Sequence, residues 1–60
     1  MTYSVEVDAK SGWLQVCTCR TFDDAKTMAK HYACELERDA RVARYRPEFN
    51  VLFRAAEQAQ

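Results

Sequence analysis

Apolar and polar residues alternate strictly over residues 2–8, which read T-Y-S-V-E-V-D. This period of two is typical of a half-buried strand. A polar stretch follows, in which Gly12 can adopt the positive φ that closes a tight turn. A second strand over about residues 13–20 is expected to form a hairpin with the first.

The residues Ala9–Gly12 are expected to form the loop of this hairpin, which determines the pairing of the two strands. The expected pairs are Val7 with Leu14, Val5 with Val16 and Tyr3 with Thr18. This register collects aliphatic side chains of both strands on one face, as burial of that face requires. The opposite face receives Glu6, Asp8, Trp13, Gln15, Cys17 and Cys19.

From Phe22 onward the apolar residues recur at helical spacing, which predicts a helix over about residues 22–38. Thr21 can cap the first turn of this helix. Asp23 and Asp24 lie in the same turn, where the positive end of the helix dipole favours negatively charged side chains. The pattern breaks near Asp39, and no glycine or proline marks the end of the helix.

Two further short strands are predicted over about residues 41–45 and 50–54, joined by a turn that contains Pro47. A five-residue loop aligns Ala43 with Phe53 and leaves Arg44 and Arg46 on the outer face. A four-residue loop aligns Val42 with Phe53 instead. We favour the first register because it separates apolar from charged side chains more cleanly. Residues 55–60 are expected to be a frayed helical turn or unstructured.

These elements predict an α+β fold of ββαββ order, in a single domain over residues 1–60. One helix packs on one face of a small antiparallel sheet, and the other face is left open. The two hairpins can lie side by side or edge to edge. The composition, 48% hydrophobic and 30% charged, is that of a globular chain, and 60 residues support only a small core.

The formal net charge is zero, so no overall field steers the chain to nucleic acid or to an anionic membrane. The longest uncharged stretch is far short of the roughly 20 apolar residues that span a bilayer. The first ten residues lack the apolar block of a signal peptide. Three cysteines are an odd count, and we expect them to be reduced thiols in a cytoplasm.

Four residues have the side chains of a zinc site, namely Cys17, Cys19, His31 and Cys34. Their spacing does not fit a metal knuckle, and the expected register points the first two away from the helix. We interpret the cysteines as small apolar fillers and expect neither a metal nor another cofactor. A single glycine excludes a phosphate-binding loop, and His31 with Cys34 on one helical turn offers no oxyanion hole. We therefore expect no enzyme activity.

Two surfaces are candidates for binding. The C-terminal hairpin combines the cations Arg41, Arg44, Arg46 and Arg54 with the rings of Tyr45 and Phe49, which suits nucleic acid, although charge on an edge strand also prevents aggregation. The open sheet face carries Trp13 rimmed by Glu6, Asp8 and Gln15, which has the composition of a protein-binding hot spot. In that case Trp13 is the anchor. Otherwise Trp13 completes a thin core, or a homodimer buries the face.

The segments YSVEVDAKSGW, TFDDAKTMAKHYA and RVARYRPEFNVLF follow one another in a layout that resembles small phage and mobile-element proteins of the anti-CRISPR type. The resemblance implies a non-catalytic inhibitor that binds a bacterial defence complex in the bacterial cytoplasm. Many such inhibitors are strongly acidic and imitate DNA. This chain is neutral, which leaves room only for a local acidic patch of Glu6, Asp8, Asp23 and Asp24. A nucleic-acid-binding module that uses the arginine strip is the alternative function.

Overall fold

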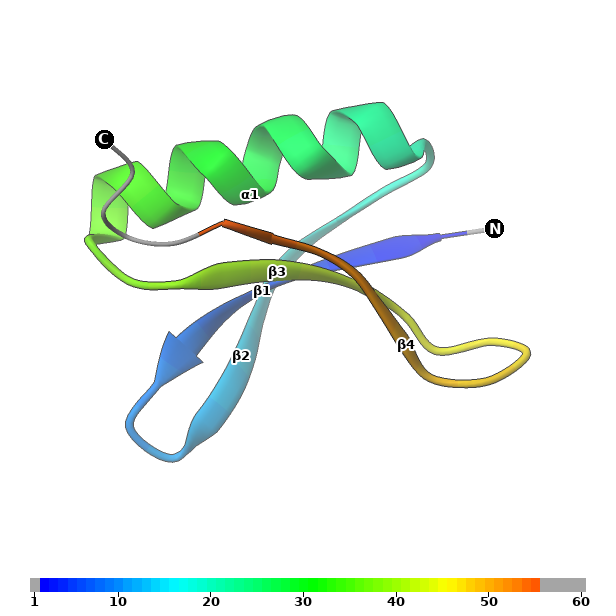
Figure 1. Cartoon of the computed structure of the whole chain (residues 1–60), viewed down its shortest axis with the longest axis horizontal. Helices are drawn as coiled ribbons and strands as arrows, with labels where there is room; N and C mark the ends of the chain where they lie inside the picture. Colours follow the sequence, from blue (N-terminus) through cyan, green and yellow to red (C-terminus); the bar gives the residue numbers. More distant parts are fainter. Residues whose placement is uncertain (1, 56–60) are drawn as a thin grey trace.

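Four strands and one helix follow one another in the expected ββαββ order in the computed structural model, which describes residues 2–55. The sheet is antiparallel with the strand order β2-β1-β3-β4, and α1 lies across one of its faces (Figure 1). The α+β prediction is confirmed, and the two hairpins lie side by side through β1 and β3. The elements are β1 Tyr3–Ala9, β2 Gly12–Cys19, α1 Phe22–Leu36, β3 Ala40–Arg44 and β4 Asn50–Ala55.

The first hairpin has the expected pairing near its turn and a different pairing farther away. Gly12 has a φ of 133° and pairs with Ala9, so the loop is shorter than the four residues predicted. Val7 pairs with Leu14 as expected, but a β-bulge at Val16 shifts the rest of the register. The expected pairs of Val5 with Val16 and of Tyr3 with Thr18 are therefore wrong, since the partners are Cys17 and Cys19.

This bulge has a clear consequence for the two cysteines of β2. Strict alternation would point both thiols away from the helix, onto the face that carries Trp13. The extra residue reverses the alternation, so that Cys17 and Cys19 pack against the core. Their predicted place beside Trp13 is wrong.

The second hairpin also contains a bulge. Val42 pairs with Phe53, whereas Ala43 pairs with Val51, so Leu52 is the extra residue of β4. The favoured pairing of Ala43 with Phe53 is wrong, and the alternative pairing at Val42 is confirmed. Val42 is fully buried under the helix, and this register brings Phe53 to the same core. Pro47 lies in the connecting loop as predicted, and β4 extends to Ala55, where a tail was expected to begin. The remaining tail residues, 56–60, lie outside the described residues.

The helix begins as predicted and ends two residues earlier. Thr21 Oγ1 accepts a hydrogen bond of 3.2 Å from the backbone N–H of Asp24, which confirms the cap. The last helical residue is Leu36, and Glu37 adopts the left-handed conformation with a φ of 55°. The backbone N–H of Arg38 then donates to the carbonyl of Ala33 at 3.3 Å. No helix within residues 2–55 has the length and apolar character needed to cross a membrane.

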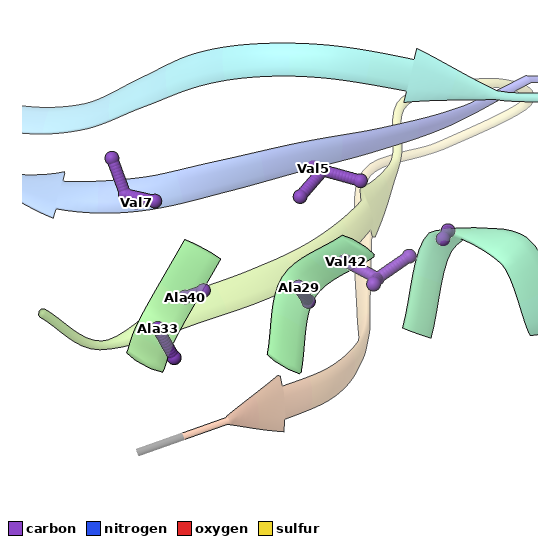
Figure 2. Close-up of a cluster of buried hydrophobic side chains, with 7 residues drawn as sticks. Val5, Val7, Ala29, Ala33, Ala40 and Val42 are labelled. Carbon is purple, nitrogen blue, oxygen red and sulfur yellow. The ribbon is translucent and has the colours of Figure 1, made fainter. Parts of the chain in front are cut away.

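The hydrophobic core consists of small side chains. Ala25, Ala29 and Ala33 form one stripe of the helix, and they face valines of the sheet (Figure 2). The largest fully buried side chains are Val5 and Val42. The apolar pattern of the sequence predicts that Leu14 and Leu36 lie in the core, but their exposed fractions are 57% and 46%. A core of this size contributes little stability, so contacts on the other face of the sheet matter more.

Replacing Glu37 with glycine should raise the free energy of unfolding by about 0.5–1 kcal/mol, because glycine adopts the left-handed conformation without a Cβ penalty. Urea denaturation measures the change. The control is Glu35→Gly, an exposed position inside the helix, which should lower stability by about 1 kcal/mol. Destabilisation of similar size by both variants would contradict the assigned helix end.

Candidate functional site

The face of the sheet that points away from α1 combines charged and polar side chains with three aromatic rings, and we call it the second face. Trp13 pairs with Asp8, Gln15 with Glu6, and Arg41 with Glu6 on the other side of β1. The four predicted contact residues therefore share one face. The second face comprises Ser4, Glu6, Asp8, Trp13, Gln15, Thr18, Arg41, Ala43, Val51 and Arg54, together with Tyr45 and Phe49 from the β3–β4 loop.

Glu6 is the centre of this face, and it is only 3% exposed. Its Oε1 accepts a hydrogen bond of 2.7 Å from Arg41 Nε, in a salt bridge between two largely buried side chains. Its Oε2 accepts from the Ser4 hydroxyl at 3.0 Å and from the Tyr45 hydroxyl. Gln15 Nε2 donates to Ser4 Oγ at 2.8 Å, which links β2 to the same network. A buried carboxylate is tolerated only with partners of this kind.

These contacts set the protonation states of the network. Burial raises the pKa of Glu6, but hydrogen bonds from Tyr45, Arg41 and Ser4 and the charge of Arg41 outweigh it and hold this pKa below its usual value. The hydrogen bond that Tyr45 donates to this carboxylate raises the pKa of the Tyr45 hydroxyl. At neutral pH Glu6 is therefore ionised and Tyr45 keeps its proton.

Arg41 also connects the network to the aromatic rings of the second face. Its guanidinium carbon lies 4.3 Å from the ring centroid of Trp13 and 5.3 Å from that of Phe49. The rings of Phe49 and Tyr45 are 5.2 Å apart. We call Trp13, Phe49 and Tyr45 the aromatic row. The three residues are 36%, 52% and 50% exposed, so Trp13 is not a core residue.

A hollow lies at each end of the aromatic row. The larger one, which we call the Tyr45 groove, has a volume of about 640 Å³. Its lining residues are Thr2, Ser4, Gln15, Thr18, Tyr45, Arg46 and Pro47. The smaller one, of about 230 Å³, is lined by Trp13, Asp39, Ala40, Arg54 and Ala55. Each hollow therefore combines one arginine with one ring of the row.

The predicted arginine strip is divided by the sheet. Arg41 and Arg54 pair with each other and lie on the second face, where Arg41 is engaged by Glu6. Arg46 is exposed in the loop. Arg44 is half-buried and alternates with Arg41 and Ala43, so it lies on the helix side together with Val42. The expectation that Arg44 lies on the outer face is therefore wrong.

The acidic residues do not gather into the patch that the resemblance allowed. Glu6 is buried and paired, and Asp8 is exposed at the end of β1. Asp23 and Asp24 lie in the first turn of α1, in the other layer of the fold. A shared acidic surface is thereby excluded for these four residues.

The candidate metal ligands are also separated. Cys17 and Cys19 pack under the helix, whereas His31 and Cys34 are exposed on α1. Within residues 2–55 no group of three or more His, Cys, Asp or Glu side chains could hold a metal ion. Burial and the neighbouring Cys19 raise the pKa of the Cys17 thiol, so this thiol remains protonated at neutral pH.

Sequence reasoning missed the roles of Ser4, Arg41, Tyr45 and Phe49 in one network. Arg41 meets Glu6 only because β1 and β3 are neighbours, and the strand order was not predicted. A charge-pair argument between the outward positions of these two strands was the one available signal.

Comparison of the chain with protein-family models, with curated proteins and with solved structures finds no match. The geometry of the second face is therefore the basis for any functional conclusion.

The lowered pKa of Glu6 predicts a loss of stability in acid. The unfolded chain binds a proton near pH 4.5, while folded Glu6 binds it only at lower pH, so stability falls as the pH drops through this range. In Glu6→Gln this part of the acid dependence should be absent, whereas the exposed control Glu35→Gln should keep it. Urea midpoints between neutral pH and pH 2.5, taken with sucrose present so that Glu6→Gln remains folded, measure the difference. Parallel curves for wild type and Glu6→Gln would contradict the assigned network.

Proposed function

We propose that this chain is a non-catalytic interaction domain that binds another protein through its second face. The observation that supports this proposal is the aromatic row, in which three large rings remain exposed beside the paired Arg41. Tryptophan, tyrosine and arginine are the residues most often responsible for binding energy at protein interfaces. Trp13 is the expected anchor, with Asp8 and Gln15 beside it, and Glu6 acts from below by holding Arg41.

The buried network favours binding because it orders the rings before the partner arrives. Arg41 is held by Glu6 and stacks against Trp13 and Phe49, while the Tyr45 hydroxyl is tied to the same carboxylate. Ordering interface side chains in the free protein reduces the entropic cost of association.

The same network argues against acid–base catalysis. A general acid or base needs a pKa near the working pH, and the shifts at Glu6 and Tyr45 both move away from neutrality. The oxygens of Glu6 are also occupied by groups of the chain itself.

The finer form of the proposal concerns the partner. The resemblance in layout to anti-CRISPR proteins supports a stoichiometric inhibitor from a phage or mobile element, which blocks a bacterial defence complex in the cytoplasm by occupying its surface. The support for this partner class is the layout of the chain, whereas the support for protein binding is the second face itself.

Binding of single-stranded nucleic acid is the second candidate function. Arg46 and Arg54 stand in the hollows at the two ends of the aromatic row, where phosphates could contact them while bases stack on the rings. Two of the four arginines are removed from this role, because Arg41 is paired with Glu6 and Arg44 lies on the helix side of the sheet. Affinity would then fall steeply with salt.

Affinity capture from bacterial lysate, with and without nuclease, tests both candidates. The wild type should retain one protein complex in both arms, and the purified complex should bind about 30-fold more weakly to Trp13→Ala, since an interface anchor contributes about 2 kcal/mol or more. The matched control is Leu14→Ala, which removes a neighbouring exposed side chain from the other face.

Three results would count against protein binding through the second face. Recovery that vanishes with nuclease would favour nucleic acid. An equal effect of Trp13→Ala and Leu14→Ala would place the contact elsewhere. If Trp13→Ala unfolds by circular dichroism, Phe49→Ala replaces it, and unchanged binding of that folded variant would exclude the aromatic row.

A further inference from the structure

We propose that the Tyr45 groove is the subsite for an acidic side chain of the partner, presented on a peptide segment next to an apolar residue. This inference rests on the proposed function and specifies the chemistry of the partner at one end of the second face.

Charge is the first argument. Arg46 is the one charged residue among the described residues that line the groove. It is exposed, and its guanidinium can present paired N–H donors to a carboxylate. None of the seven described lining residues is acidic, so a carboxylate that enters the groove meets a cation without a competing anion among them.

The nearest carboxylate is already compensated. Glu6 lies below Ser4 and Tyr45, which line the groove, but it is buried and forms a salt bridge with Arg41. Its oxygens accept from Ser4, Tyr45 and Arg41. The negative charge under the groove is therefore largely cancelled, and it opposes an acidic ligand only weakly.

The walls of the groove select for an apolar neighbour of the acid. The Tyr45 hydroxyl is committed to Glu6, so Tyr45 offers its ring to a ligand, and Pro47 adds a second apolar surface. The Ser4 hydroxyl donates to Glu6 and accepts from Gln15, so the floor is occupied by internal hydrogen bonds. The volume of about 640 Å³ is within the range of pockets that enclose small ligands.

A peptide segment fits this groove better than a nucleic acid strand. A strand carries a phosphate at every nucleotide and needs several cations along its path. The groove provides one cation, and Arg54 lies in the other hollow beyond the aromatic row. One arginine beside apolar walls matches one acidic side chain beside one apolar side chain.

A random 12-residue peptide library displayed on phage, panned on the wild-type protein, is the probe. Selected peptides should share an aspartate or glutamate next to an apolar residue. A synthetic copy should bind about tenfold more weakly to Arg46→Gln, as expected for loss of one charge-assisted hydrogen-bonded contact. The control is Arg54→Gln, an exposed arginine on the same face, which should change the affinity less than threefold. Replacing the acid of the peptide by its amide should weaken wild-type binding about tenfold and leave Arg46→Gln binding unchanged.

Several outcomes would overturn the proposal. Peptides without a shared acid, or equal losses with Arg46→Gln and Arg54→Gln, would mean that the groove has no acidic subsite. Displacement of the peptide by a 12-residue oligothymidylate, in a manner dependent on Arg46, would favour nucleic acid. Failure to select any peptide, while Trp13-dependent capture of a protein complex succeeds, would overturn the subsite but leave the proposed function intact. Loss of that capture would overturn the proposed function itself.

Discussion

The salt bridge between Glu6 and Arg41 is the interaction on which both layers of this small protein depend. A carboxylate that is only 3% exposed is costly unless its charge and lone pairs are satisfied, and here three strands and one loop contribute to that task. The salt bridge joins β1 to β3, and the hydrogen bonds extend the connection to β2 and to the β3–β4 loop. Arg41 then supports the rings of Trp13 and Phe49. The second face, which we propose binds a partner, is therefore held in place by the salt bridge between Glu6 and Arg41.

The two faces of the sheet are stabilised by different kinds of interaction. On one side, alanines of α1 pack on valines of β1 and β3, and valines are the largest fully buried side chains among residues 2–55. Domains of this size gain little from hydrophobic burial alone. On the other side, ion pairing, hydrogen bonding and ring stacking hold the strands together while three aromatic residues stay exposed. A variant of this face therefore affects stability and binding together, unless the side chain lies at its rim, as Arg46 does.

Local patterns in the sequence were sufficient for the elements and their order. Alternation gave β1 and the turn at Gly12, helical spacing and Thr21 gave the start of α1, and the outward positions of the first hairpin gave the shared face of Glu6, Trp13 and Gln15. Such signals depend only on residues close in the chain, so they predict an element without knowledge of its tertiary contacts.

The remaining features depend on contacts between distant residues. The bulge at Val16 brings Cys17 and Cys19 under the helix, and the bulge at Leu52 accompanies the register that brings Phe53 there. Neither bulge has a local signature in the sequence. Glu6 was expected to rim an open surface because its position is outward, yet a partner 35 residues away buries it. That pairing requires β1 and β3 to be neighbours, which a single sequence with two separate hairpins does not determine. For the same reason the arginine strip, continuous along the chain, is split between the two faces.

A double-mutant cycle on Glu6→Gln and Arg41→Gln is the most direct measurement of the central role of this salt bridge. The free energies of unfolding are measured with trimethylamine N-oxide present, so that the single variants remain folded. Each single variant should lose about 3 kcal/mol, because it leaves one buried charge without its partner. The double variant should lose less than the sum of the two, with a coupling energy of about 1–3 kcal/mol. Losses that add to within about 0.5 kcal/mol would show that the two residues act independently, and would contradict this account of the second face.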